Sequence, residues 1–182
     1  MGLDRQLFYA INGWPDSWSP FFFVLSELTK LPAARVALVA LVIGLVIYKP
    51  TRVATVLANV SWLLANETCD QFKAFGKGLR PNVELPDVHV RVAHLTSFGT
   101  ASAHSANMAA LATAFWLRLG WKWGLPWAIL AFLTGLSRIY NGVHYPSQVL
   151  LGWGVGCIVA FLIVRLYEGW VRSRNVEPAS GS

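Results

Sequence analysis

Apolar runs separated by short polar turns are the feature that most limits how this chain can fold. They cover residues 36–48, 53–72, 102–117, 123–137 and 147–165. Only 13% of the residues are charged, whereas soluble domains carry about 25%, so lipid must solvate much of the surface. Runs of this length and composition are typical of membrane helices. They predict an all-α integral membrane bundle.

The N-terminal part adds two shorter segments. Residues 3–12 have the pattern of an amphipathic helix at the membrane surface, and we expect it on the same side of the membrane as the C-terminal tail. Residues 17–30 form a helix that crosses the membrane or only enters it, so five or six transmembrane helices are predicted. One domain covers residues 1–175, with its core at 60–156. Residues 176–182 are predicted to be a disordered tail, whose final Gly-Ser resembles a cloning remnant.

The apolar runs are short for membrane spans. Sixteen residues of α-helix cover about 24 Å, whereas the hydrocarbon core is about 30 Å thick. The polar ends of the helices must supply the missing length, and such ends are stable when they face protein or a water-filled cavity. We therefore expect the polar helix ends to gather inside the bundle.

The charge of the chain indicates its partners and its orientation. The net charge of +6 suits anionic partners such as lipid headgroups or phosphates, and the apolar runs exclude a nucleic-acid binder. Lys and Arg divide eight to seven between the tail side and the other side. The division becomes eight to four when Lys73, Arg80 and Arg138 are set aside as site residues. The positive-inside rule then places the tail in the cytoplasm.

Three polar clusters fall on the side opposite to the tail. They are KAFGKGLRP (73–81), ASAHSAN (101–107) and SRIYNGVHYPSQ (137–148). Each cluster alone is typical of helix packing or of contact with lipid headgroups. Together they offer Arg, Lys and two His without a set of metal ligands, which suits a phosphate group. Of two imidazoles at one phosphorus atom, one can attack and the other can protonate the leaving oxygen.

The clusters resemble the signature KxxxxxxRP, PSGH and SRxxxxxHxxxD of the type 2 phosphatidic acid phosphatase superfamily, over residues 60–156. The matching residues are Lys73, Arg80, Pro81, Ser102, His104, Ser137, Arg138 and His144. The superfamily consists of membrane-integrated lipid phosphatases that need no metal. The resemblance implies an enzyme without a cofactor, in the inner membrane of a bacterium, with its site facing the periplasm or the exterior.

The resemblance also implies a role for each matching residue. His144 would be the nucleophile that forms a phosphohistidine, and His104 would be the general acid. Water would then hydrolyse the intermediate. The phosphate would be bound by Lys73, Arg80, Ser102, the backbone at Ala103, and Arg138.

Three positions depart from the family pattern: Ala101 replaces Pro, Ala103 replaces Gly, and Gln148 replaces Asp. The added methyl group of Ala103 is expected to be tolerated. The amide oxygen of Gln148 can accept a hydrogen bond from His144, as the carboxylate would, but it brings no negative charge. We therefore predict a correctly oriented but less nucleophilic His144, and a faster Gln148→Asp variant.

The expected substrate is a lipid phosphate or diphosphate. Conversion of undecaprenyl diphosphate to undecaprenyl phosphate is favoured, because short members of the superfamily often perform it. Phosphatidylglycerophosphate, phosphatidic acid and lipid A phosphates are alternative substrates, and a lipid phosphotransferase is an alternative activity. Gln148 favours a further alternative, a catalytically weak lipid-binding membrane protein.

Overall fold

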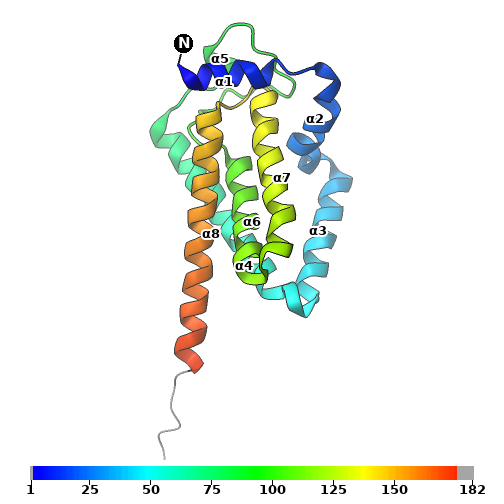
Figure 1. Cartoon of the computed structure of the whole chain (residues 1–182), viewed down its shortest axis with the longest axis vertical. Helices are drawn as coiled ribbons and strands as arrows, with labels where there is room; N and C mark the ends of the chain where they lie inside the picture. The colour runs from blue at the N-terminus through cyan, green and yellow to red at the C-terminus, as the bar shows by residue number, and fades with distance from the viewer. Residues whose placement is uncertain (1, 176–182) are drawn as a thin grey trace, which may run out of the picture.

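The computed structural model describes residues 2–175, and all regular structure within them is helical (Figure 1). The long helices are α1 (Leu3–Asn12), α2 (Ser19–Glu27), α3 (Pro32–Ile47), α4 (Lys49–Gly76), α6 (Ala103–Leu119), α7 (Trp121–Tyr140) and α8 (Pro146–Asn175). Short pieces are the 3₁₀ turns η1 (Asp16–Trp18) and η2 (Leu28–Lys30), and α5 (Pro81–Glu84). The all-α prediction is confirmed for the described residues. The predicted tail at 176–182 lies outside them.

Helix α6 lies at the centre of the bundle and packs against α4, α7 and α8. Its buried face consists largely of alanines, among them Ala106, Ala110 and Ala114. Opposite them, α8 presents Gly156, where an added Cβ would lie 2.1 Å from the carbonyl oxygen of Ala106. Small residues on both helices allow their backbones to approach this closely. The sequence GWGVG therefore serves helix packing.

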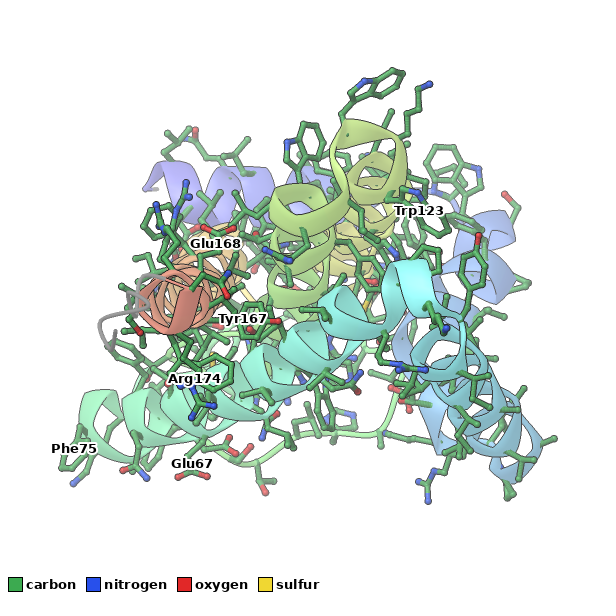
Figure 2. All side chains as sticks on the ribbon, turned by 90° about the horizontal axis from the view of Figure 1, so that it is seen from below. Glu67, Phe75, Trp123, Tyr167, Glu168 and Arg174 are labelled. Carbon is green, nitrogen blue, oxygen red and sulfur yellow. The ribbon has the colours of Figure 1, made fainter. Side chains whose placement is uncertain are left out.

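Different contacts stabilise the two ends of the bundle. Glu168 and Tyr167 of α8 lie at the end seen in Figure 2. Arg118 of α6 pairs with Glu168 at 3.2 Å. The same guanidinium lies 5.4 Å from the ring centroid of Tyr167. At the opposite end the long loop between α4 and α6 folds over the bundle and is covered by α1 (Figure 1). The polar clusters of the sequence lie at this second end.

The position of α1 corrects one expectation. Helix α1 lies beside α5, at the end of the bundle opposite to the C-terminal end of α8 (Figure 1). Asp4 accepts hydrogen bonds from the backbone N–H and the hydroxyl of Ser147, at 2.8 and 2.6 Å, and Arg5 pairs with Glu84. Arg5 therefore counts with the site end, and the corrected division of Lys and Arg becomes seven to five. The positive-inside rule therefore supports a cytoplasmic position of the tail side less strongly than the division of eight to four did.

Residues 17–30 do not form a separate straight helix. The segment Asp16–Lys30 and helix α3 are long and apolar enough for a membrane span only when taken together. They are bent by 73° relative to each other at a break near Leu31. Pro32 begins α3, and no side chain of α3 is buried within the structure. Among the described helices, α8 is the one that by itself is long and apolar enough to cross a membrane. The number of spans stays a prediction.

Candidate active site

Gln148, in the first turn of α8, connects the three polar clusters. Its Oε1 accepts a hydrogen bond from Nδ1 of His144 at 2.9 Å and another from the backbone N–H of Tyr145 at 3.3 Å. Its Nε2 donates to the carbonyl oxygen of Leu79 at 2.7 Å, next to Arg80. Its backbone carbonyl accepts the N–H of Ser102 at 3.0 Å. One residue thus joins segments that lie far apart in the sequence.

Arg80 lies beside His144 and is 4% exposed. Its Nη1 is 2.8 Å from Nε2 of His144 and donates to the carbonyl oxygen of Val143 at 3.0 Å. Its Nε donates to the carbonyl oxygen of Ser97 at 2.7 Å, and Nη2 donates to the Ser97 hydroxyl and to the carbonyl oxygen of Phe98, both at 3.2 Å. The guanidinium is therefore held between the nucleophile candidate and the loop before α6.

The partners of His144 determine its tautomer. A guanidinium can only donate, so Nε2 of His144 must accept from Arg80 and carries a lone pair. The proton then resides on Nδ1, which donates to the amide oxygen of Gln148. Burial lowers the pKa of His144 well below its ordinary value, and the positive charges of Arg80 and Arg138 lower this pKa further. The imidazole is neutral at pH 7, as a nucleophile must be.

Arg138, in the last turn of α7, is 3% exposed and also lies close to His144. Its Nη1 contacts the hydroxyl of Ser26 and lies 3.6 Å from Oε1 of Glu27. Its backbone carbonyl accepts the N–H groups of Val143 and His144 at 3.1 and 3.2 Å. The buried Nε of Arg138 has no hydrogen-bond partner among the described residues. A phosphate oxygen would supply the partner that this N–H group lacks.

Ser102, Ala103 and His104 lie at the start of α6. Ser102 is fully buried and caps the helix, since its Oγ accepts from the backbone N–H of Ser105 at 3.4 Å and from the Ser105 hydroxyl at 2.9 Å. Ala103 is the first residue of the helix. His104 is half-buried, and none of the described residues hydrogen-bonds to its imidazole. Its ring is free to contact a substrate.

The imidazole of His104 lies near four cations, which are Arg138, Lys30, Lys73 and Arg80. Three of them were predicted from the sequence. Lys73, near the end of α4, pairs with Asp70 through Nζ at 2.6 Å and forms no hydrogen bond or ion pair with the other predicted site residues, all of which the structure describes. Its phosphate contact stays a prediction. Lys30 belongs to none of the three sequence clusters.

The loop before α6 supplies residues that the sequence analysis missed. Ser97 and Phe98 hold Arg80, and Gly99 lies where an added Cβ would be 2.6 Å from Cγ of Arg80 and 3.1 Å from Oε1 of Gln148. Ser26 and Glu27 contact Arg138 in the same way from α2. Gly99, next to the second cluster, was the one residue whose type could have indicated that this loop packs closely on the site. Contacts made through backbone carbonyl oxygens, or by side chains of a distant helix, have no motif in the sequence by which they could be predicted.

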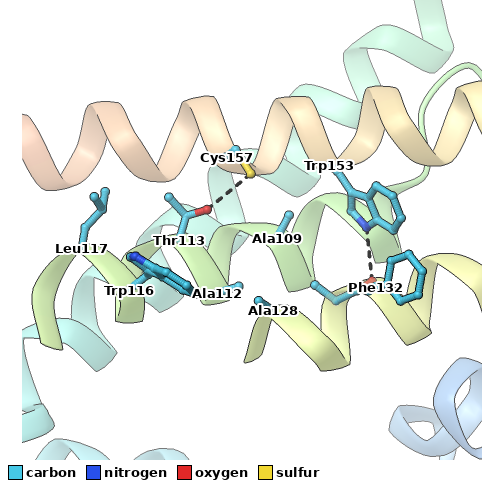
Figure 3. A pocket seen from close by; sticks show the side chains of 10 residues that line it. Ala109, Ala112, Thr113, Trp116, Leu117, Ala128, Phe132, Trp153 and Cys157 are labelled. Atoms are coloured by element: carbon cyan, nitrogen blue, oxygen red, sulfur yellow. Dashed lines mark hydrogen bonds between the residues drawn. The ribbon is translucent and has the colours of Figure 1, made fainter. Parts of the chain in front are cut away.

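A separate apolar cavity of about 390 Å³ lies between α6, α7 and α8, away from the polar site (Figure 3). Trp153 closes one side of it, and its indole N–H donates to the carbonyl oxygen of Ala131 at 3.2 Å. Thr113 donates to the sulfur of Cys157 at 3.4 Å on the other side.

Within residues 2–175 no group of three His, Cys, Asp or Glu side chains could hold a metal ion.

The comparisons with known proteins agree with the geometry. The family model described as PAP2 superfamily matches residues 52–172. The chain is 26% identical to undecaprenyl-diphosphatase BcrC of Bacillus subtilis, with 97% of each chain covered. It is 28% identical to the lipid A 4'-phosphatase of Porphyromonas gingivalis, over 94% of this chain and 75% of that one. A bacitracin transport permease protein BcrC of Bacillus licheniformis is 28% identical, and 63% of its length is covered.

A solved structure shows the same arrangement of helices. The crystal structure of Aquifex aeolicus LpxE superposes with a TM-score of 0.77 at 26% identity, covering 91% of this chain and 96% of that one. The superposed 91% of the chain is more than residues 60–156 alone would account for. The similarity therefore concerns the whole bundle.

Proposed function

Because this chain belongs to the PAP2 superfamily and is a lipid phosphatase of that family, we propose that it hydrolyses undecaprenyl diphosphate to undecaprenyl phosphate. The undecaprenyl-diphosphatase relative, which matches along its full length, supports this substrate. We place the reaction at the outer face of a bacterial inner membrane. The observation that carries the chemistry is the order of hydrogen bonds around His144, which presents the lone pair of Nε2 beside Arg80.

The first step would transfer the terminal phosphoryl group to His144. Its Nε2 attacks phosphorus, a P–N bond forms, and the bond from phosphorus to the bridging oxygen breaks. The electron pair of that bond stays on the oxygen, which leaves with the lipid phosphate and takes a proton from His104, whose protonated form is stabilised by the negative charge of the bound substrate. Gln148 holds the Nδ1–H of His144 while the ring becomes positively charged.

The second step would release inorganic phosphate. A water molecule gives a proton to His104 and attacks phosphorus, and the P–N bond breaks with its electron pair returning to Nε2. Arg80 must give up its hydrogen bond to Nε2 when phosphorus approaches, which frees Nη1 for a phosphate oxygen. The unpaired Nε of Arg138 offers a second donor. Two guanidinium groups on opposite sides of phosphorus would stabilise the charge of the transition state.

A lipid A phosphate is the second candidate substrate, favoured by the relative from Porphyromonas gingivalis. Phosphate release from undecaprenyl diphosphate, lipid A, phosphatidylglycerophosphate and phosphatidic acid, measured with the purified protein in detergent, would rank the candidates. Preference for another lipid would contradict undecaprenyl diphosphate as the substrate and would leave the phosphatase activity standing.

We predict that His144→Ala lowers hydrolysis at least 1,000-fold, on the order of the loss seen when a covalent nucleophile is removed. We also expect activity to persist in EDTA and to be inhibited by vanadate, because no step uses a metal ion and vanadate resembles the pentacoordinate transition state. Phosphate release from the preferred lipid is the measurement, and mass spectrometry detects any phosphoryl group passed to an acceptor lipid. Equal rates for wild type and His144→Ala would favour a lipid-binding protein instead.

A further inference from the structure

Glu27 and Lys30 bring a fourth cation to the site from outside the three sequence clusters. Glu27 is buried, and its two carboxylate oxygens contact two different cations. Oε1 lies 3.6 Å from Nη1 of Arg138, and Oε2 lies 2.5 Å from Nζ of Lys30. Lys30 and Arg138 thus share one carboxylate, so Lys30 is held next to a residue expected to bind phosphate.

The fold holds this pair in place. Helix α2 packs against α7, the helix that carries Arg138. The turn η2 follows α2 directly, and the carbonyl oxygen of Thr29 accepts a hydrogen bond from Nε of Arg35 at 2.7 Å. A bend of 73° separates this turn from α3, and the contacts of Glu27 with Lys30 and Arg138 place the turn beside the site. Lys30 is therefore part of a fixed turn, and its charge acts on His104 as well.

The two cations differ in depth. The side chain of Arg138 is 3% exposed, whereas that of Lys30 is 54% exposed. Arg138 is therefore buried, whereas Lys30 lies nearer to the surface of the molecule. One carboxylate cannot neutralise both, so the pair keeps one net positive charge for an anion. A single phosphate has Lys73, Arg80 and Arg138 to contact, and Lys30 remains for a second anionic group further out.

We propose that Lys30 binds the second phosphate of a diphosphate lipid, the phosphate that stays attached to the lipid and leaves, and thereby sets a preference for diphosphates over monophosphates. Glu27 is the positioning residue that holds Lys30 beside Arg138. This inference rests on the proposed phosphatase function and deepens it. When the bond to the bridging oxygen breaks, the leaving lipid phosphate gains negative charge, which the ammonium group of Lys30 stabilises.

The experiment compares two substrates that differ by one phosphate. Farnesyl diphosphate and farnesyl phosphate carry the same lipid tail, and kcat/KM for each is measured in detergent. We expect Lys30→Gln to lower kcat/KM for the diphosphate about tenfold, the factor for a lost charge-assisted contact of about 1.4 kcal/mol, and to change that for the monophosphate less than twofold. Lys30→Arg should restore the preference. Lys77→Gln, the same charge change on an exposed lysine at the same end, should leave both values unchanged.

Binding of inorganic pyrophosphate and inorganic phosphate, measured by calorimetry on the same variants, separates this inference from the proposed function. Lys30→Gln should weaken pyrophosphate binding about tenfold and phosphate binding little. A wild type that hydrolyses neither farnesyl substrate would overturn the proposed function, while the calorimetry still tests Lys30. An equal loss for both ligands, or no loss for either, would overturn the role of Lys30. Thermal unfolding of each variant shows whether it is folded.

Discussion

At the residue scale, the tautomer of His144 follows from its neighbours. Arg80 offers only donors, so Nε2 must accept, and the proton on Nδ1 then requires an acceptor at position 148. The amide oxygen of Gln148 meets this requirement. The amide nitrogen has a separate task, because it donates to the carbonyl oxygen of Leu79. Gln148 therefore combines the orientation of the nucleophile with a structural bond that a carboxylate cannot make.

We predict that Gln148→Asp raises kcat about tenfold, because a carboxylate beside Nδ1 stabilises the positive charge that His144 acquires, and about 1.4 kcal/mol off the barrier has this effect. We expect the same variant to unfold at a lower temperature, since the carbonyl oxygen of Leu79 loses its donor at a cost of about 1–3 kcal/mol. Steady-state kinetics and thermal unfolding in detergent are the measurements. Gln148→Asn, which has the same length as Asp without the charge, is the control.

The pH profile provides a second test of the same pair. Because burial and Arg80 lower the pKa of His144, the wild-type acid limb of kcat/KM should lie below pH 6.5, the ordinary value for histidine. A carboxylate at position 148 favours the protonated imidazole, so the acid limb should move to higher pH in Gln148→Asp. The ionisation of the substrate is common to both proteins and cancels in the comparison. An unchanged limb would contradict the assigned contact.

At the element scale, the close packing of α6 and α8 holds the second and third clusters together. The backbone N–H of Ser102 donates to the carbonyl oxygen of Gln148, and Gly152 allows the two helices to meet at this point, because an added Cβ would lie 2.4 Å from the carbonyl oxygen of Ser102. Gly156 repeats this contact one turn further along α8. The glycines thus allow the start of α6, which carries His104, to lie directly against the first turns of α8.

We predict that Gly156→Ala destabilises the protein by about 1–3 kcal/mol, the usual cost of overpacking, because the methyl group would meet the backbone of Ala106. Gly154→Ala is the matched control, since a Cβ there meets nothing within 4 Å. Thermal unfolding in the same detergent compares the two variants. Equal unfolding temperatures would show that α6 and α8 can separate without loss of stability.

At the scale of the whole molecule, α1 closes the site end of the bundle. Asn12 donates through Nδ2 to the carbonyl oxygens of His89 and Tyr140, both at 2.9 Å. Arg91 donates to the carbonyl oxygens of Asn12 and Tyr140 at 2.9 and 2.8 Å, and it pairs with Asp16 at 2.7 Å. The N-terminal helix, the long loop and the end of α7 are therefore one unit. The N-terminus and the tail end of α8 lie at opposite ends.

This arrangement predicts which residues share a side of the membrane. In a background with Cys69→Ser and Cys157→Ser, we expect Gly2→Cys and Asp87→Cys to react with a membrane-impermeant maleimide in intact cells. Arg174→Cys should react only after the cells are permeabilised, because residue 174 lies at the C-terminal end of α8, whereas the site lies at the N-terminal end of this helix. Labelling of Gly2→Cys together with Arg174→Cys, and not with Asp87→Cys, would contradict the position of α1.

The sequence by itself determined the helical class and the family signature, and it proposed most of the residues of the candidate site. Periodicity and apolar runs are local properties, so α4, α6, α7 and α8 were predicted close to their observed places. The motif spacing is also a local property, so it could propose His104, His144, Arg80 and Arg138 as site residues, and their roles stay predictions. The role of Gln148 as an acceptor for His144 was predicted in the same way and agrees with the observed contact.

The tertiary structure alone decided which side α1 takes, how α2 and α3 bend, and what surrounds the cations. Ser97, Phe98, Glu27 and Lys30 reach the site through backbone carbonyls or from a distant helix. Such contacts depend on the packing of α2 against α7 and on the fold of the loop before α6, and neither leaves a local pattern. Whether a segment forms a helix depends on its own residues, whereas which helices lie next to each other depends on the packing of the whole bundle.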